Sequence, residues 1–360
     1  MSDYLRLLEQ RVLIFDGAMG TQLMALELSA GDFGGARYEG CYEALVLSRP
    51  DAIRAIHEAY LEAGADVVET DSFTGSRLKL DEFGLGERTY EINARAAQLA
   101  REACAKFDAP DRPRFVAGSM GPTGMLISSS DPSLSKISYD RLCDVYGEQA
   151  RALVEGGADL LILETMQDLL ELKAAIAGVV REFERGLRRV PIQAQPTLIT
   201  EGRMLLGTDV AAICATLDAL PVDVVGLNCS TGPAQMRDPI RYLCENSRCF
   251  VSVIPNAGLP LMGPAGETIY PETPEELAAE LAGFVRDFGV NVVGGCCGST
   301  PEHIAALVRA CRTERAVGTT AARAARIAEL RRTALDTRPQ NVASAMTAVA
   351  LEQEPRPLIV

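Results

Sequence analysis

The sequence of 360 residues contains no tryptophan and only two histidines, His57 and His303. Without tryptophan, the chain lacks the aromatic ring that best forms a cage around a quaternary ammonium group. Two isolated histidines lack the clustered spacing of a histidine metal site, so we expect neither to be a ligand. Any metal site in this chain is therefore expected to use other side chains.

Long apolar runs are missing as well. No run of about 18 apolar residues is present to span a membrane, and the first residues do not form a charged-then-apolar secretory leader. We therefore expect a cytoplasmic protein without a membrane segment.

Positive charge is sparse. The chain has 35 Lys and Arg residues against 49 Asp and Glu residues, which gives a formal net charge of −14. Recognition of phosphate depends on clustered Lys and Arg side chains. No basic stripe occurs before residue 313, so we predict that the protein does not bind nucleic acid.

The chain contains ten cysteines, and three of them have an unusual sequence context, which we call the cysteine frame. Cys296 and Cys297 are adjacent within the glycine cluster 294–298, and Cys229 ends the apolar segment 222–228. Adjacent residues in a regular strand point to opposite faces, so the pair can share one ligand only where glycines let the backbone turn. Simple core packing or a strained disulfide is the alternative for such a pair. The other seven cysteines have no such frame, and we interpret them as structural.

The three framed cysteines favour a metal centre with an open position. A chain of this size without a secretory signal more often uses cysteines for metal binding or catalysis than for disulfides. A catalytic zinc ion typically has three protein ligands and keeps its fourth position for water or substrate. We therefore predict a zinc site of Cys229, Cys296 and Cys297 that can accept a substrate thiol.

Short β-rich segments alternate with longer amphipathic stretches, in which apolar residues recur every three or four positions as in helices packed on a sheet. Eight such units within about 310 residues predict a (β/α)₈ TIM barrel, and a doubly wound open sheet is the alternative. The expected strands are 11–15, 66–73, 114–119, 159–165, 192–198, 222–228, 250–255 and 290–296. The clearest expected helices are 51–63, 88–105, 139–155, 169–183, 274–288 and 301–312.

Polar residues follow several of the expected strands. A barrel of this kind carries its chemistry at the carboxyl ends of its strands. The lone cysteine follows the sixth strand and the cysteine pair the eighth, so both halves of the predicted metal site are expected at one rim. The residues expected at this rim also include Asp16, Gly17, Asp71, Glu164 and Asn256.

The last part of the chain differs in composition. From 313 to about 353 it is rich in Ala, Arg and Thr and has one helical pattern near 321–335. The terminal residues 354–360 resemble the first strand of a further domain. We therefore expect a barrel domain at 1–312, a partly helical linker at 313–353 and the start of another domain at 354–360, with a plain C-terminal tail as the alternative.

Four motifs together resemble the zinc-dependent homocysteine S-methyltransferase family over residues 11–312. Within it they are most similar to the N-terminal homocysteine-binding module of the cobalamin-dependent methionine synthases, in which a folate-binding barrel follows. The cysteine frame is the specific part, because a glycine pattern after a strand is common on its own. The motifs are Asp16-Gly17-Ala18-Met19-Gly20-Thr21, Gly226-Leu227-Asn228-Cys229, Pro255-Asn256-Ala257-Gly258 and Gly294-Gly295-Cys296-Cys297-Gly298-Ser299-Thr300-Pro301-Glu302-His303.

The resemblance implies that Cys229, Cys296 and Cys297 hold zinc and that the sulfur of homocysteine becomes the fourth ligand. A zinc-bound thiol is deprotonated, whereas a free thiol with a pKa of about 8.5 is only a few per cent thiolate at neutral pH. The resemblance further implies methyl transfer to this thiolate, which gives methionine. Methylcobalamin on a partner module would be the donor, and the cobalamin-binding and folate-binding modules would belong to the same longer chain.

The resemblance also places Asp16 and Glu164 near the amino group of the substrate, with Asn256 and the backbone around Gly17 assisting. An ammonium group needs a carboxylate partner, and a substrate carboxylate needs N–H donors. Asp16 has a structural alternative as the cap of a turn, and Asn256 has one as a bridge between loops. The alternative is weaker for Glu164, because a carboxylate after four apolar residues is costly to bury without a partner.

Asp71 departs from the family pattern, in which asparagine is more common at this position. A further carboxylate near an anionic zinc site is unfavourable unless it faces the substrate ammonium or a hydrogen-bond donor. We therefore include Asp71 only as an additional candidate for substrate binding.

Two other functions remain open at this point. The first is a stand-alone homocysteine S-methyltransferase that uses S-methylmethionine or betaine. The missing tryptophan argues against betaine, although Tyr38 and Tyr42 could supply a cage. The second is a non-catalytic zinc- or thiol-binding module, which would show four protein ligands that persist when homocysteine is added.

Overall fold

The computed structural model describes residues 2–264, 266–311, 322, 325–329, 341–343 and 348–350. Eight parallel strands form one sheet in the order β1-β10-β7-β6-β5-β4-β3-β2. They are β1 (Leu13–Ile14), β2 (Val67–Glu69), β3 (Phe115–Met120), β4 (Leu160–Met166), β5 (Ile192–Pro196), β6 (Val224–Asn228), β7 (Phe250–Ile254) and β10 (Val292–Val293).

The two edge strands of this sheet meet. A parallel bridge pairs Phe15, just after β1, with Val67 of β2. Next to it, the amide of Asp66 donates to the Ile14 carbonyl (2.7 Å) and the amide of Asp16 donates to the Val67 carbonyl (3.0 Å). The predicted (β/α)₈ barrel is thereby confirmed, and the open doubly wound sheet is excluded.

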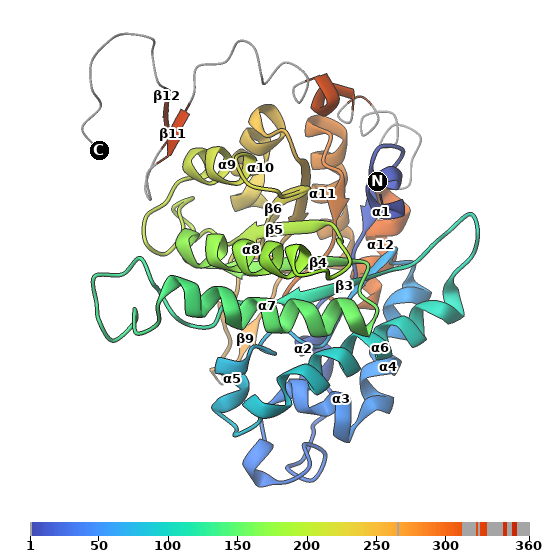
Figure 1. Ribbon diagram of the computed structural model, residues 1–360. Helices are drawn as coiled ribbons and strands as arrows, with labels where there is room; N and C mark the ends of the chain where they lie inside the picture. Colours follow the sequence, from blue (N-terminus) through green and yellow to red (C-terminus); the bar gives the residue numbers. More distant parts are fainter. Residues whose placement is uncertain are drawn as a thin grey trace.

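Helices connect the strands and cover the outside of the barrel (Figure 1). All six expected helices are present, and the units after β5 and β6 add α9 and α10. Thr273 is the N-cap of α11 and forms a capping box with Glu276. The Thr273 hydroxyl accepts a hydrogen bond from the Glu276 amide, and the Glu276 carboxylate accepts one from the Thr273 amide. The barrel helices are α4 (Pro50–Ala63), α6 (Thr89–Phe107), α7 (Tyr139–Gly156), α8 (Leu169–Glu184), α9 (Val210–Asp218), α10 (Pro233–Asn246), α11 (Pro274–Phe288) and α12 (Pro301–Cys311).

Shorter elements lie between the barrel units. Two small strands form an antiparallel hairpin in the loop after β7, and two others pair near residue 345. None of these was expected from the sequence. The short strands are β8 (Leu261–Met262), β9 (Thr268–Ile269), β11 (Asn341–Ala343) and β12 (Ala348–Ala350). The short helices are α1 (Asp3–Leu8), α2 (Met19–Met24), α3 (Leu45–Ser48) and α5 (Arg77–Asp81). The 3₁₀ turns are η1 (Ala36–Tyr38), η2 (Tyr42–Ala44) and η3 (Gly86–Arg88).

Two expected strands end several residues before their predicted carboxyl ends. The strand predicted at 66–73 ends at Glu69, because the amide of Ser72 donates to the Thr70 carbonyl (2.8 Å) and turns the chain. The strand predicted at 290–296 ends at Val293, before the glycine pair. Both differences lie at the carboxyl ends of the strands, where polar residues leave the sheet.

The inside of the barrel is a packed apolar core. Phe15, Phe115 and Ile162 belong to it, together with Tyr4 of α1 and Ile327. The ring of Tyr4 packs edge-on against Phe115 with centroids 5.6 Å apart. Since α1 precedes β1 and Phe115 begins β3, α1 covers the amino-terminal end of the barrel.

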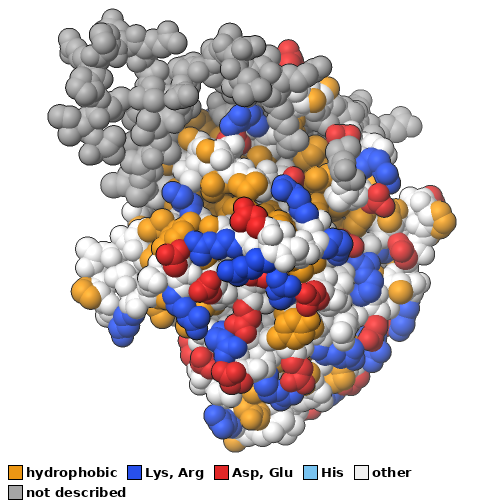
Figure 2. All heavy atoms as spheres, in the orientation of Figure 1, with side chains coloured by type: hydrophobic (Ala, Val, Ile, Leu, Met, Phe, Trp, Pro, Cys, Tyr) orange, Lys and Arg blue, Asp and Glu red, His pale blue; other side chains and the backbone are white. Residues whose placement is uncertain are grey.

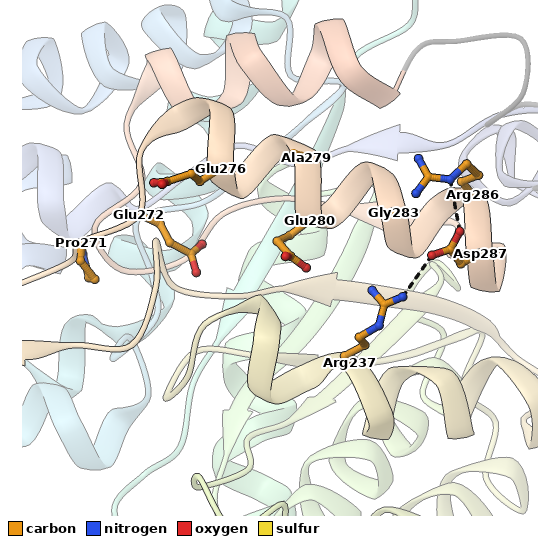
Figure 3. Close-up of a pocket in the computed structure, with 9 residues that line it drawn as sticks. All are labelled: Arg237, Pro271, Glu272, Glu276, Ala279, Glu280, Gly283, Arg286 and Asp287. Atoms are coloured by element: carbon orange, nitrogen blue, oxygen red, sulfur yellow. Dashed lines mark hydrogen bonds and ion pairs between the residues drawn. The ribbon is translucent and has the colours of Figure 1, made fainter.

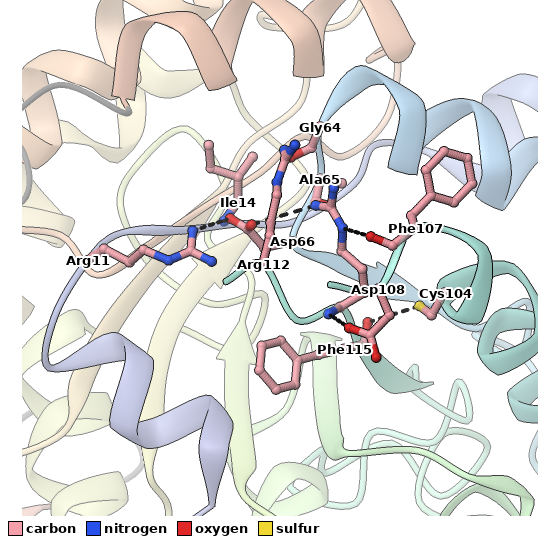
Figure 4. Close-up of polar contacts among 11 residues, drawn as sticks. Arg11, Ile14, Gly64, Ala65, Asp66, Cys104, Phe107, Asp108, Arg112 and Phe115 are labelled. Atoms are coloured by element: carbon pink, nitrogen blue, oxygen red, sulfur yellow. Dashed lines mark hydrogen bonds and ion pairs between the residues drawn. The ribbon is translucent and has the colours of Figure 1, made fainter. Parts of the chain in front are cut away.

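A buried polar cluster also holds this end together (Figure 4). The carboxylate of Asp66 accepts hydrogen bonds from the Ile14 amide (3.1 Å) and the Arg11 guanidinium (3.1 Å). It also lies 3.7 Å from the guanidinium of Arg114, and Arg112 donates to the Gly64 carbonyl (2.9 Å). The cluster ties the starts of β1, β2 and β3 together.

On the face shown in Figure 2, Lys and Arg side chains are interspersed with Asp and Glu side chains. Within the described residues, no helix is both long and apolar enough to cross a membrane.

The predicted linker and following domain remain largely outside the described residues. Residues 322 and 325–329 are helical, in the region of the helix expected near 321–335. The predicted domain start at 354–360 lies outside the described residues.

Candidate metal and substrate site

Three cysteine sulfurs converge at the carboxyl end of the barrel. Cys229 follows β6, and Cys296 and Cys297 follow β10. The three Sγ atoms all lie within 4.8 Å of one another, and Cys229 Sγ is 3.8 Å from Cys297 Sγ. Among the described residues, this is the one group of three His, Cys, Asp or Glu side chains that could hold a metal ion.

Turns in the backbone bring these sulfurs together. Cys229 and Ser230 both have left-handed conformations, with φ values of 60° and 65°. The amide of Cys296 donates to the Pro255 carbonyl (2.7 Å), and the amide of Ser299 donates back to the Cys296 carbonyl (3.1 Å). Gly298 takes a φ of 80°, which glycine adopts without strain. The adjacent cysteines therefore sit in a turn, which is the geometry they need to share one ligand.

One of the three thiols ionises readily, whereas hydrogen bonds within the cluster raise the pKa of Cys229 to about 12 and that of Cys296 well above its usual value. Hydrogen bonds from Cys229 and Cys296 lower the pKa of Cys297 to about 3, and a hydrogen bond from the Tyr270 hydroxyl adds to this effect. All three cysteines are free thiols rather than disulfides. Soft thiolate ligands suit zinc, and three of them leave one position of a tetrahedral ion open. The residues present therefore fit a zinc ion.

A pocket of about 410 Å³ opens beside the cysteines. Its lining comes from the carboxyl ends of β2, β3, β4 and β7 and from the segments that follow β1, β2, β6, β7 and β10. Among the described residues that line it, there is no Lys, Arg or His. The lining instead includes four carboxylates, which are Glu43, Glu69, Asp71 and Glu164. Such a pocket favours a ligand with a positively charged group.

Glu164 is held firmly at the end of β4. One carboxylate oxygen accepts a hydrogen bond from the Ser119 hydroxyl (2.5 Å), and the other accepts one from the side-chain amide of Asn228 (3.1 Å). Burial raises the pKa of Glu164 to about 7, even though both hydrogen bonds favour the ionised form. A positively charged partner would restore the ionised form of this side chain.

Glu69 also lines the pocket, and sequence analysis missed it. Burial raises the pKa of Glu69 well above its usual value, and the negative charges of Glu164 and Asp16 raise it further. Glu69 is the last residue of β2 and therefore lies at the rim where the other polar residues gather. The position at a strand end was the signal that could have identified it.

Neither Asp16 nor Asn256 lines the pocket. Asp16 is buried and accepts a hydrogen bond from the Glu69 amide (3.0 Å), so it braces the end of β2. Burial raises the pKa of Asp16 well above its usual value. Asn256 is buried, and its side-chain oxygen has no hydrogen-bond partner among the described residues.

Gly17 lines the pocket at a point where a side chain would not fit. A Cβ atom at Gly17 would lie 2.7 Å from the Ser299 hydroxyl oxygen and 2.8 Å from the Tyr60 ring. The glycine therefore allows the chain after β1 to approach the turn that carries the cysteine pair.

Asp71 is the pocket carboxylate that keeps an unsatisfied oxygen. It is 6% exposed, and its Oδ2 atom has no hydrogen-bond partner among the described residues. Burial raises the pKa of Asp71 well above its usual value, and the nearby charge of Glu43 adds to this shift. Glu43 itself is satisfied, because it accepts hydrogen bonds from the amide (2.7 Å) and hydroxyl (2.5 Å) of Thr74.

The remaining candidates lie in different places. Tyr42 lines the pocket, and Tyr38 does not. Tyr270, which follows the β8–β9 hairpin, lines the pocket and was missed because its loop has no periodic pattern. His57 is buried within α4, and His303 contacts Thr300 in the first turn of α12.

A larger hollow of about 670 Å³ lies elsewhere, between α10 and α11 (Figure 3). It is lined by acidic side chains such as Glu272, Glu276 and Glu280 and contains none of the three cysteines. Asp287 pairs there with Arg237 (3.1 Å) and Arg286 (3.2 Å). This hollow is therefore separate from the cysteine site.

Comparison with known proteins agrees with the geometry. The family model for homocysteine S-methyltransferase matches residues 13–311. The chain belongs to the homocysteine S-methyltransferase family. It is 45% identical over 320 residues to a methionine synthase of Mycobacterium tuberculosis and 45% identical over 303 residues to one of Mycobacterium leprae. These matches cover 88% and 84% of this chain but only 26% and 24% of the relatives, so the chain spans about a quarter of their length.

Solved structures of the same family share this fold. The homocysteine methyltransferase MmuM from Escherichia coli superposes in its metallated form with a TM-score of 0.66 and 23% identity, which covers 84% of this chain and 97% of that chain. Its oxidized form superposes with a TM-score of 0.65 and 24% identity, which covers 83% of this chain and 95% of that chain. At this level of identity the likeness supports the barrel fold.

Proposed function

We propose that this homocysteine S-methyltransferase barrel binds zinc through Cys229, Cys296 and Cys297 and transfers a methyl group to the thiol of homocysteine, which gives methionine. The observation that carries the proposal is the convergence of the three sulfurs within 4.8 Å beside a pocket rich in carboxylates. Zinc bound there would lower the pKa of the substrate thiol, so that the thiolate is present at neutral pH.

The chain's own residues would orient the substrate. Glu164 is buried and Glu69 is half-buried, and both carboxylates line the pocket, so each would gain from pairing with the ammonium group of homocysteine. Asp71 is a further partner for this group, and Asp16 supports the arrangement through the Glu69 amide. Backbone N–H groups around Gly17 would receive the substrate carboxylate, and Asn256 would assist from outside the lining.

We also propose that the methyl donor is methylcobalamin on another module of a longer protein. The matched part of this chain covers only 26% and 24% of the two methionine synthases, which leaves room for cobalamin-binding and folate-binding modules. Residues 1–312 would then be the homocysteine-binding domain, 313–353 a linker and 354–360 the start of the next domain. Transfer from methylcobalamin requires in-line placement of the two reactants rather than a general acid.

Zinc binding by the three cysteines can be tested directly. Each of Cys229→Ala, Cys296→Ala and Cys297→Ala should abolish tight zinc binding, because a structural or catalytic zinc site needs its full set of protein ligands. Cys311→Ala is the matched control, since this cysteine is buried in α12 and belongs to no cluster. The measurement is zinc content after dialysis, together with zinc-edge X-ray absorption with and without homocysteine.

The wild-type protein should contain one zinc ion with three sulfur ligands, which become four when homocysteine is added. Full zinc content in all three cysteine variants would contradict the metal site. A sulfur shell that does not respond to homocysteine would contradict thiol activation and favour a non-catalytic module.

A further inference from the structure

We infer that Asn228 is a positioning residue, which links the carboxylate that receives the substrate ammonium to the turn that carries Cys229. The inference rests on the proposed function and deepens it. Asn228 is the last residue of β6, lies directly before Cys229 and is 1% exposed. The sequence pattern alone predicts no role for Asn228 beyond its place in the motif that ends at Cys229.

The side-chain amide of Asn228 reaches across to β4. Its oxygen accepts a hydrogen bond from the Thr165 amide (2.7 Å), and its nitrogen donates to the Thr165 hydroxyl (2.8 Å) and to Glu164 Oε2 (3.1 Å). A carboxamide has two N–H donors and one carbonyl acceptor, so both donors and the acceptor are in use. Neither aspartate nor leucine could make the same set of contacts.

Backbone strain is concentrated around this side chain. Among the described residues, four non-glycine residues have a positive φ, and three of them are Thr165 (56°), Cys229 (60°) and Ser230 (65°). A positive φ is a real outlier for a β-branched residue such as threonine. Strained conformations persist only where the surrounding structure holds them, and they gather at functional sites. Asn228 holds Thr165 through its side chain and precedes the other two in the chain.

The link connects the two ends of the proposed substrate. Cys229 belongs to the group that would receive the homocysteine sulfur, and Glu164 is a carboxylate that would receive its ammonium. Asn228 fixes the position of Glu164 relative to Cys229 through one rigid amide. The protein thereby sets the distance between the group that would bind the substrate sulfur and the carboxylate that would bind its ammonium before the substrate arrives. Efficient binding requires this kind of pre-organisation.

The substitution Asn228→Asp separates the two functions of the amide. Aspartate keeps an oxygen for the Thr165 amide, but it replaces the donor to Glu164 with an anionic oxygen. We expect the dissociation constant of homocysteine to rise about tenfold or more, as when a charge-assisted hydrogen bond is replaced by repulsion. Binding of 4-mercaptobutanoate, which is homocysteine without its amino group, should change little, because that ligand does not need Glu164.

The control is Asn291→Asp. Asn291 is also fully buried and also accepts a backbone hydrogen bond, from the Val251 amide (3.0 Å). It precedes β10 and therefore lies at the opposite end of the barrel from the cysteines. Both thiols should bind to this variant as they do to the wild type, and its thermal unfolding measures the general cost of a buried aspartate.

Isothermal titration of both thiols into the zinc-loaded full chain decides the question. Selective loss of homocysteine affinity in Asn228→Asp supports the inference. Equal weakening of both thiols, or no weakening of either, overturns it, because a purely structural residue would not distinguish the two ligands. A wild-type protein that binds neither thiol through zinc would instead overturn the proposed function, on which the inference depends.

Discussion

One buried histidine outside the site makes the stability of this protein depend on pH. His57 is completely buried in α4, and neither ring nitrogen has a hydrogen-bond partner among the described residues. Burial lowers the pKa of His57 to about 4, whereas an unfolded chain has a histidine pKa of about 6.5. The unfolded state therefore binds a proton at His57 below about pH 6.5, whereas the folded state binds it only below about pH 4. Stability is lost as the pH falls through this window.

The substitution His57→Leu should remove this dependence. Between pH 7 and pH 5 the wild-type protein should lose about 2 kcal/mol of unfolding free energy from this one group. The leucine variant should lose correspondingly less over the same interval, because it has no proton to bind. Urea unfolding of both proteins at the two pH values measures the difference. Parallel losses in the two proteins would contradict the assignment.

Individual residues of the site were predictable to different degrees. The cysteines were predictable because an adjacent pair framed by glycines has few structural explanations, and Glu164 because a carboxylate after an apolar strand needs a partner. Glu69 and Tyr270 were missed, since one reads as part of a strand and the other lies in an irregular loop. Asp16 and Asn256 do not line the pocket, because only tertiary contacts decide which polar residue at a rim faces inward.

At the scale of elements, closure of the barrel depends on a buried ion cluster. Asp66 connects the starts of β1 and β2 (Figure 4). It also lies beside Arg114, whose side chain is buried as well. Removal of one partner from a buried ion cluster leaves an uncompensated charge, which typically costs about 3–5 kcal/mol. We therefore expect Asp66→Ala to destabilise the whole barrel by an amount of this order.

Urea unfolding measures this effect. Asp3→Ala serves as the control, because Asp3 forms an exposed pair with Arg6 on the surface. Exposed pairs contribute at most about 1 kcal/mol, so the control should unfold nearly as the wild type does. Similar stability of the Asp66 and Asp3 variants would show that the cluster does not close the barrel.

The type of each major element was predictable from periodicity, and its ends were less so. The 3.6-residue period of α4 and α7 persists over several turns, which makes such helices easy to recognise. The β8 and β9 strands have two residues each, and a period of two cannot be detected in so short a segment. The early ends of β2 and β10 follow from local turns that hydrogen bonds in the folded protein create.

At the scale of the whole molecule, at least one residue beyond the last barrel helix is buried in the core. Ile327 is 2% exposed and belongs to the core inside the barrel. A chain that stops after residue 312 should still fold cooperatively, because all eight strands and their helices precede that point. It should lose about 1.5–3 kcal/mol, which is the typical contribution of one fully buried isoleucine.

The substitution Ile327→Ala in the full chain should reproduce most of this loss. Thermal unfolding of the truncated, substituted and wild-type proteins makes the comparison. A truncated chain without a cooperative transition would show that the tail belongs to the folding unit rather than to a linker.

The overall architecture was predictable because the alternation of strand and helix extends over the whole barrel. Eight repeats of one unit constrain the topology far more than any single segment does. The sequence could not show whether the sheet closes, since the pairing of β1 with β10 and the bridge from Phe15 to Val67 of β2 are both tertiary contacts.

The covered end of the barrel bears on the order of events during turnover. Because α1 covers the amino-terminal end and apolar side chains fill the interior, both reactants must use the opening at the carboxyl end. A bulky methyl carrier seated over that opening would block the path of a small amino acid. Under the proposed function, homocysteine would then enter before the methyl carrier and methionine would leave after it, which is the pattern that steady-state kinetics recognises as compulsory-order addition.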